Sequence, residues 1–282
     1  MPIAPAHRPA IPAALARSCF LLSAERLGTP VADTALTADL VILDLEDSVA
    51  PTAKAAARED AAEWMRGGHR CWVRVNVTTG PFWRNDIERL RSVPELAGVM
   101  VPKAESVDAL EEVFRLLGGD IPLIALVESA VGIEAAPELA RAKGVARLAF
   151  GSGDYRRDTG TSDDDLAMSY PRSRLVTASR VGDLPGPIDG PTLGLEPQES
   201  SLRARTSARL GMTGKLCLAP DDVAVANAAF SPSADEVDWA EAFLSAFEAR
   251  GSVARDGSDL PRLATARKIQ RLASVFGGSG GR

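Results

Sequence analysis

Histidine is nearly absent from this sequence of 282 residues. The two histidines, His7 and His69, fall near the start and in a predicted helix-to-strand turn, so a metal site or proton relay built on histidine is not expected. Cysteine is also scarce: Cys19, Cys71 and Cys217 each lie in an apolar run, and their odd number and wide spacing fit neither a disulfide framework nor a zinc site. We expect three buried, reduced thiols.

Sequence signatures of several common ligand sites are missing. There is no Walker A sequence and no G-x-S-x-G elbow, and the "GSGD" at residues 151–154 lacks the third glycine of a dinucleotide fingerprint. A net charge of −6 argues against nucleic acid or an anionic membrane as a partner, because both call for a basic surface. The start lacks the apolar core of a signal peptide and no run reaches membrane-span length, so we expect a cytoplasmic protein.

What the sequence does contain is an alternation of short apolar runs with amphipathic stretches. Stretches such as "PTAKAAAREDAAEWMRG" and "SVDALEEVFRLLGG" have the composition and spacing of helices packed on one side. Strand-helix alternation predicts parallel pairing, and eight units in about 210 residues favour a (β/α)8 barrel, which takes roughly 250 residues, over an open doubly wound sheet. The apolar runs predict eight strands, beginning at Cys19, Leu40, Cys71, Gly98, Pro122, Arg147, Gly186 and Lys215.

We place the barrel domain at residues 15–230 and a C-terminal helical extension at residues 231–282. The extension begins with "SPSADEVDWAEAFLSAFEARG", in which a serine-proline start and an acidic first turn predict a helix. The final "GGSGGR" and the proline-rich first dozen residues are expected to be a flexible tail and a loose arm. The chemistry is therefore expected in the barrel.

Polar residues close most of the predicted strands. Active sites of (β/α)8 barrels lie where strands lead into helices, so these residues are candidates for chemistry. Contact with solvent explains any one polar strand end, whereas the convergence of many on one edge indicates a site. The candidates in chain order are Asp44, Glu46, Asp47, Arg74, Asn76, Lys103, Glu128, Ser129, Asp154 and Asp189.

Glu128 and Asp154 close neighbouring strands, so their carboxylates are expected side by side at the barrel mouth. Two anions this close repel each other unless a proton or a cation lies between them. Two carboxylates, with the other positions open to water and substrate, are typical of Mg²⁺, and we favour this interpretation. The alternatives are a general acid and base pair, or acids paired individually with Arg74 and Lys103 as structural ion pairs.

Arg74 lies within the third apolar run, where a permanent charge is costly unless it meets an anion at the barrel mouth. Its planar guanidinium group suits a substrate carboxylate held by two hydrogen bonds. The alternative is a salt bridge to Glu46 or Asp47 on the adjacent strand. Both interpretations hold together if these acids orient an arginine that binds substrate.

Six motifs follow one another between about Arg17 and about Phe247. They are "LVILDLEDSVAPTAKAAAR" from Leu40, "VRVN" from Val73, "VMVPKAES" from Val99, "LIALVESAVGI" from Leu123, "LAFGSGDYRRDTG" from Leu148 and "FSPSADEVDWA" from Phe230. In this order they resemble the HpcH/HpaI aldolase and citrate lyase superfamily, in particular its citrate lyase β-subunit-like CoA-ester lyases. The resemblance implies a (β/α)8 barrel that assembles as a homotrimer or hexamer.

The resemblance also implies a reaction. Such proteins use Mg²⁺ to cleave or form a carbon-carbon bond, so we expect a lyase that acts on a short 3-hydroxy acyl-CoA such as citryl-, malyl- or citramalyl-CoA. The acids that match Glu128 and Asp154 bind the metal ion, and the arginine that matches Arg74 holds a substrate carboxylate.

Further roles follow from the same resemblance. Glu46 and Asp47 are expected to orient their neighbours or to transfer protons. Lys103 and Gly153 are the other candidates for contact with the substrate. We also expect Gly151 and Gly153 to let the backbone turn closely at the top of the sixth strand.

Two departures from the family pattern concern the end of the chain. Ala219 stands where a histidine is usual and Asp222 where a glutamine is common, so we expect the mouth to lack one polar group, and the catalytic base is unassigned. Residues 251–268 show no recognisable counterpart of the C-terminal lid of longer relatives. Other activities compatible with the site are a 2-oxo-acid aldolase, a malyl-CoA-type thioesterase and a non-catalytic subunit that binds CoA esters or oxo acids.

Overall fold

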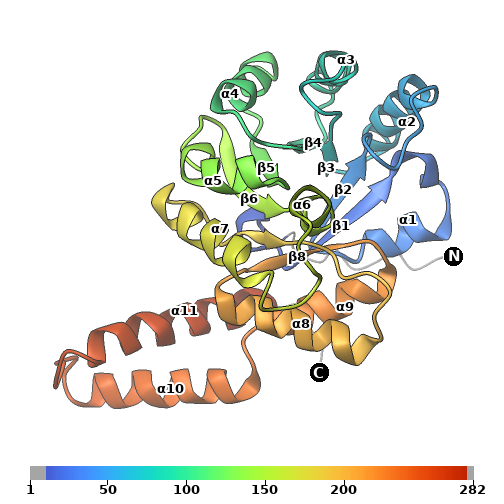
Figure 1. Ribbon diagram of the computed structural model, residues 1–282. Helices are drawn as coiled ribbons and strands as arrows, with labels where there is room; N and C mark the ends of the chain where they lie inside the picture. The colour runs from blue at the N-terminus through green and yellow to red at the C-terminus, as the bar shows by residue number, and fades with distance from the viewer. Residues whose placement is uncertain (1–10, 278–282) are drawn as a thin grey trace, which may run out of the picture. The chain divides into compact units, whose positions relative to one another are not determined.

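Parallel strands form a closed barrel in the computed structural model, which describes residues 11–277 (Figure 1). Each of the eight apolar runs predicted from the sequence forms one strand, so the (β/α)8 prediction is confirmed. Most of the expected N-terminal arm and of the C-terminal tail lies outside the described residues. The strands, which follow chain order around the barrel, are β1 (Ser18–Ser23), β2 (Leu40–Asp44), β3 (Cys71–Arg74), β4 (Leu96–Val101), β5 (Leu123–Val127), β6 (Val145–Phe150), β7 (Ile188–Asp189) and β8 (Gly214–Cys217).

Helices connect the strands and cover the outside of the barrel (Figure 1). Two short 3-10 turns, η1 (Ala13–Leu15) and η2 (Ala24–Arg26), flank β1. The helices of this part of the chain are α1 (Pro30–Ala35), α2 (Lys54–Arg66), α3 (Trp83–Leu90), α4 (Val107–Leu116), α5 (Ala130–Leu139), α6 (Ser152–Thr159), α7 (Ser169–Val181), α8 (Pro197–Leu210) and α9 (Pro220–Ala229).

The apolar side chains form two layers because successive strand residues face opposite sides. The smaller cluster includes Ile42, Trp72, Met100 and Leu216 and fills the barrel interior. The larger cluster packs the outer strand faces against the helices. The three cysteines are buried free thiols, as predicted, and burial raises the pKa of Cys19 and Cys71 to about 12.

A buried arginine closes the amino-terminal end of the barrel. Arg147, at 2% exposure, donates hydrogen bonds to the carbonyl oxygens of Ala13, Ala16 and Gly186 and to the hydroxyl of Thr213. These partners satisfy the guanidinium group through neutral oxygens. The opposite end of the barrel is therefore the one available to ligands.

Pro12–Phe230 form one compact unit, and the described residues from Ser231 onward belong to a second. In the second unit, α10 (Ala234–Ala249) and α11 (Asp259–Gly277) pack through a small apolar cluster that includes Phe243 and Leu263. The helix predicted from the serine-proline start and acidic first turn forms as α10, and Ser233 and Glu236 cap it reciprocally. None of the described helices combines the length and the apolar character needed to cross a membrane.

Candidate functional site

A cavity of about 640 Å³ lies at the carboxyl ends of the strands. Seven strands contribute residues to it, either directly or through the segment that follows them. Of the residues that the sequence singled out, seven line this cavity: Asp44, Asp47, Arg74, Glu128, Gly151, Gly153 and Asp154. The charged lining residues are Glu25, Arg26, Asp44, Asp47, Arg74, Glu128 and Asp154.

Arg74 at the end of β3 is held by Asp44 at the end of β2. The two residues are register partners on neighbouring strands, and both are buried. Arg74 donates from Nε and Nη2 to the two carboxylate oxygens of Asp44, each at 2.7 Å. Asp44 thus occupies the Nε and Nη2 side of the guanidinium group, which would otherwise suit a substrate carboxylate held by two hydrogen bonds.

Glu46 links Arg74 to Lys103. Its Oε2 lies 3.0 Å from Arg74 Nη1, and its Oε1 accepts a hydrogen bond of 3.0 Å from Lys103 Nζ. The sequence therefore predicted one of the salt-bridge partners of Arg74 correctly. Asp47 is exposed, and within residues 11–277 no ion pair joins it to Arg74. Burial raises the pKa of Glu46, although the positive charge of Arg74 opposes this shift.

Glu128 follows β5 and is almost fully buried. Its Oε1 accepts a hydrogen bond of 2.8 Å from the backbone N–H of Lys103, whose φ of +48° lies in the left-handed region. Burial raises the pKa of Glu128 to about 8, and the negative charges of Glu46 and Asp154 add to this effect. The ionised form of Glu128 is therefore short of a positive partner.

Asp154 lies in the first turn of α6 and not on β6, which ends at Phe150. Its Oδ1 is 3.0 Å from Arg157 Nη2, and its Oδ2 is 3.8 Å from Lys103 Nζ. The Lys103 ammonium thus lies between the carboxylates of Glu46 and Asp154. These ion pairs support the alternative interpretation of the sequence, in which Lys103 forms structural ion pairs with the acids.

Glu128 and Asp154 are chemically suited to hold Mg²⁺. Among residues 11–277, no group of three or more His, Cys, Asp or Glu side chains is arranged to hold a metal ion. A cation here would thus be shared by two carboxylates with water and substrate oxygens, which is the usual mode of Mg²⁺ binding. Burial, with the nearby charges of Glu46 and Asp154, raises the pKa of Glu128, and a bound divalent cation would favour its ionised form instead.

Gly151 is required by the position of Glu128. A Cβ atom on Gly151 would lie 2.3 Å from Glu128 Oε2 and 2.5 Å from Glu128 Cβ, far inside van der Waals contact. A Cβ atom on Gly153 would have no neighbour within 4 Å. The close approach predicted for both glycines is therefore a property of Gly151, and the prediction for Gly153 is wrong.

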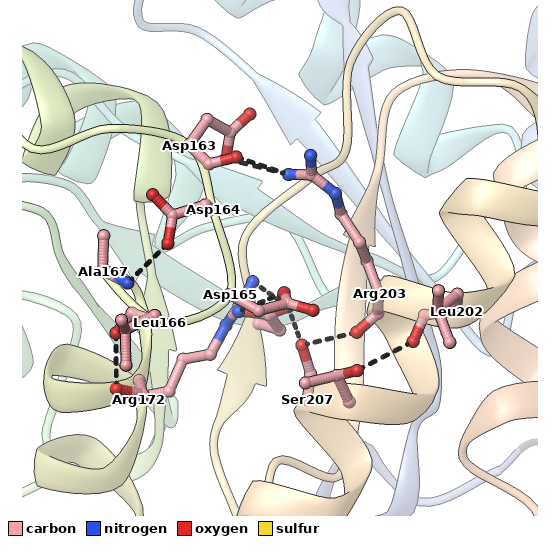
Figure 2. Close-up of polar contacts among 12 residues, drawn as sticks. Asp163, Asp164, Asp165, Leu166, Ala167, Arg172, Leu202, Arg203 and Ser207 are labelled. Carbon is pink, nitrogen blue, oxygen red and sulfur yellow. Dashed lines mark hydrogen bonds and ion pairs between the residues drawn. The ribbon is translucent and has the colours of Figure 1, made fainter.

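The segment after α6 is fixed by arginines, as Figure 2 shows. Asp163 lies 3.1 Å from Arg156 Nη1 of α6 and 3.3 Å from Arg203 Nη1 of α8. Asp165 lies 3.5 Å from Arg172 Nη1 of α7 (Figure 2). These contacts make Arg156 a fixed ion-pair partner, and they anchor the helix that carries Asp154.

Asp189 does not reach the mouth, so its inclusion as a candidate was wrong. It is fully buried, and it accepts hydrogen bonds from Arg172, Ser207 and Lys215. Ile188 belongs to the cluster inside the barrel, so the next residue along β7 faces the helices. Strand periodicity, had the two-residue strand been located, would have excluded Asp189.

The sequence model of HpcH/HpaI aldolase/citrate lyase matches residues 18–220, and that of the HpcH/HpaI aldolase C-terminal domain matches residues 235–277. The chain belongs to the HpcH/HpaI aldolase/citrate lyase family. It is 32% identical over 278 residues to the citrate lyase subunit beta-like protein of Deinococcus radiodurans, covering 92% of this chain and 97% of the relative.

Two further relatives have more specific names. The L-malyl-CoA/beta-methylmalyl-CoA lyase of Cereibacter sphaeroides is 33% identical over 251 residues, covering 76% of this chain and 79% of that protein. The crystal structure of CitE from Mycobacterium tuberculosis in complex with magnesium, acetoacetate and coenzyme A has a TM-score of 0.77 and 29% identity, covering 91% of this chain and 97% of that chain.

The family comparison changes one expectation about the end of the chain. The match to the C-terminal domain includes residues 251–268, which the sequence motifs left outside the family, and α11 forms there. Ala219 is exposed at the start of α9 and is not part of the cavity lining. Alanine carries no polar atom in its side chain, so this position supplies no polar group to the mouth. Asp222 accepts hydrogen bonds from the backbone N–H groups of Leu218 and Ala219 and so fixes the end of β8.

Sequence reasoning missed the role of Asp44. We counted it among the polar strand ends but did not assign it to Arg74. The available signal was the spacing Asp44-Leu45-Glu46, because residues two apart on a strand share a face. Asp44 at the end of β2 and Glu46 just after it thus present two acids to the arginine on β3.

Proposed function

We propose that this chain is a Mg²⁺-dependent carbon-carbon lyase that cleaves, or in reverse forms, a short 3-hydroxy acyl-CoA. One observation carries the proposal: Glu128, Asp154 and Arg74 line the same cavity at the mouth of the barrel. The family membership and a neighbour whose structure contains magnesium, acetoacetate and coenzyme A support it.

The cleavage breaks the bond between C2 and C3 of the acyl chain. The C3 hydroxyl loses its proton and becomes a carbonyl, the electron pair of the broken bond moves to C2, and a proton is delivered to C2 of the departing thioester. Bound Mg²⁺ would supply Lewis-acid stabilisation of the charge on the substrate oxygens. Glu128 and Asp154 are the residues that would hold the ion.

Arg74 would orient the substrate through its carboxylate. A guanidinium fixed by Asp44 and Glu46 loses little freedom when it binds, so the reacting carbon is held in one position. Lys103 would bridge Glu46 and Asp154 and screen their mutual repulsion, while its partly exposed ammonium group would contact an anionic substrate. Gly153 leaves open space in the first turn of α6, where backbone N–H groups are suited to bind an anion.

The acids that follow β2, Glu46 and Asp47, are the candidates for proton transfer. Asp47 lines the cavity and is exposed, so it is the group best placed to exchange protons with substrate and solvent. Glu46, with its raised pKa, would act mainly by orienting Arg74 and Lys103.

A homotrimer or hexamer is the assembly we propose from the resemblance, and light scattering tests it.

Incubation of the purified protein with malyl-, citramalyl- and citryl-CoA and the matching free acids, with Mg²⁺ or EDTA, tests the proposal. Mass spectrometry should detect acetyl-CoA and an oxo acid only with Mg²⁺. Free CoA with an intact hydroxy acid would identify a thioesterase, and cleavage of free acids alone would identify an aldolase. Ligand-dependent thermal stabilisation without turnover would identify a binding subunit.

A further inference from the structure

Asp189 forms a buried charge cluster with Arg172, Lys215 and Ser207. Its carboxylate accepts hydrogen bonds of 2.9 and 3.2 Å from Arg172 Nε and Nη2, of 2.6 Å from Ser207 Oγ and of 3.3 Å from Lys215 Nζ. The four residues are buried and come from four elements, β7, α7, β8 and α8. Burial raises the pKa of Asp189, but the positive charges of Lys215 and Arg172 outweigh this effect, so the carboxylate is ionised at neutral pH.

The charge cluster lies between the strands and the helices, outside the cavity. Leu216 belongs to the apolar cluster inside the barrel, so Lys215, the residue before it on β8, faces the helices, as Asp189 does on β7. Desolvation of charges is costly, and apolar side chains of similar volume commonly give equal or greater stability at such a position. Stability alone therefore does not account for the charge cluster.

Lys215 also holds the backbone that follows β7. Its Nζ donates a hydrogen bond of 2.6 Å to the carbonyl oxygen of Gly190, the residue after Asp189. A Cβ atom on Gly190 would lie 2.2 Å from Ser152 Oγ and 3.0 Å from the Ser152 backbone nitrogen. Gly190 is therefore packed directly against the first residue of α6, and the hydrogen bond from Lys215 fixes its position.

The same turn of α6 carries Asp154, two residues after Ser152. The residue before this helix, Gly151, is packed against Glu128. The start of α6 is thus packed against both Glu128 and Gly190. A shift of Gly190 would therefore change the separation of Asp154 from Glu128. Because Mg²⁺ demands near-ideal octahedral geometry with ligands at about 2.1 Å, even a small shift would weaken its binding.

We propose that Lys215, held by Asp189, is a positioning residue for the proposed Mg²⁺ site. It fixes Gly190 against α6 and thereby sets the distance between Asp154 and Glu128. This inference rests on the proposed function, because it takes these two carboxylates as the metal ligands. Lys215 faces the helices and would touch neither the metal ion nor the substrate. Its loss should therefore weaken Mg²⁺ binding and leave the rate at saturating Mg²⁺ close to that of the wild type.

Lys215→Met tests the inference, because it removes the ammonium group and keeps the length of the side chain. Asp189 keeps Arg172 and Ser207 as partners, so we expect the variant to fold. Isothermal titration calorimetry should show Mg²⁺ binding about tenfold weaker than in the wild type, at a temperature where thermal melts show both proteins folded. In lyase assays, the Mg²⁺ concentration for half-maximal rate should rise by the same factor, whereas the rate at saturating Mg²⁺ should change by less than about twofold.

Arg147→Met is the matched control for the loss of a buried cation. Arg147 is also buried and also donates to a backbone carbonyl beside β7, that of Gly186, but at the opposite end of the barrel. This variant should lose thermal stability and should bind Mg²⁺ with wild-type affinity.

A second pair of variants tests the contact with α6 without changing any charge. Gly190→Ala should displace the start of α6 and weaken Mg²⁺ binding about tenfold, because its Cβ would overlap Ser152. Gly186→Ala is the matched control, since its Cβ would lie 2.5 Å from Thr213 Cγ2, a similar overlap at the other end of β7, and it should leave the Mg²⁺ affinity unchanged. This pair decides the question if Lys215→Met or Arg147→Met does not fold.

Failure of the inference and failure of the proposed function are distinguishable. Wild-type Mg²⁺ affinity in Lys215→Met, or in Gly190→Ala if the former does not fold, would overturn the inference and leave the lyase function standing. Equal losses of affinity in Arg147→Met or Gly186→Ala would also overturn it, because they would indicate a general loosening of the barrel. If the wild type does not bind Mg²⁺, or if Asp154→Asn binds it unchanged, the proposed metal site is refuted and the inference with it.

Discussion

Replacing Asp44 with asparagine removes the negative charge that holds Arg74. Asp44 is 1% exposed and Arg74 is 7% exposed, and two hydrogen bonds of 2.7 Å join them. Loss of one member of a buried ion pair costs about 3–5 kcal/mol. Asparagine keeps one acceptor oxygen, so we expect a loss of about 3 kcal/mol in the free energy of unfolding and a fall in Tm of about 6–12 °C.

The pH dependence of this loss follows from the pKa of Asp44. Burial raises this pKa, but the hydrogen bond and charge of Arg74, with hydrogen bonds from Ser48 and Glu46, outweigh burial and lower it below its usual value. The pair therefore stabilises the protein fully above about pH 4, the range where an unfolded aspartate is ionised, and the effect is lost as pH falls towards the folded pKa.

Urea unfolding at several pH values measures this effect. The difference between wild type and Asp44→Asn should be full at pH 7 and should shrink below about pH 4. Asp47→Asn is the control, since Asp47 is exposed beside the same cavity and should change stability by less than about 0.5 kcal/mol. Equal stability of Asp44→Asn and wild type at pH 7 would refute the reasoning. Because Arg74 would lose its orientation, kcat/KM should also fall about 100-fold.

Three further predictions concern the proposed metal site. Gly151→Ala should weaken Mg²⁺ binding and destabilise the fold by about 1–3 kcal/mol because its Cβ overlaps Glu128, whereas Gly153→Ala should be tolerated; calorimetry and thermal melts compare them. With a pKa of about 8, Glu128 stabilises the metal-free protein fully below about pH 4.5 and loses this contribution as pH rises through 8. The affinity for Mg²⁺ should accordingly rise up to about pH 8, and a pH-independent affinity would contradict the assignment. Asp154→Asn should abolish the Mg²⁺ dependence of thermal stability, whereas Asp221→Asn, an exposed charge change on α9, should preserve it.

The motifs determined the order of the catalytic elements but not the partners of each charge. The sequence placed Arg74, Glu128 and Asp154 at one edge because parallel strands end on the same side of a barrel. It did not assign Asp44 to Arg74, since a choice among three acids depends on strand register, which is decided by long-range packing. The misplacement of Asp189 has the same cause, because the side a residue faces depends on where a short strand begins.

The sequence by itself determined the fold class and the two carboxylates proposed to hold Mg²⁺. Hydrophobic periodicity and motif order are local properties, so they can be read without coordinates. Only the tertiary structure decided that Gly151 makes room for Glu128 and that Lys103 lies between two acids. Each of these facts joins residues far apart in the chain, and closure of the barrel is the physical event that brings them together.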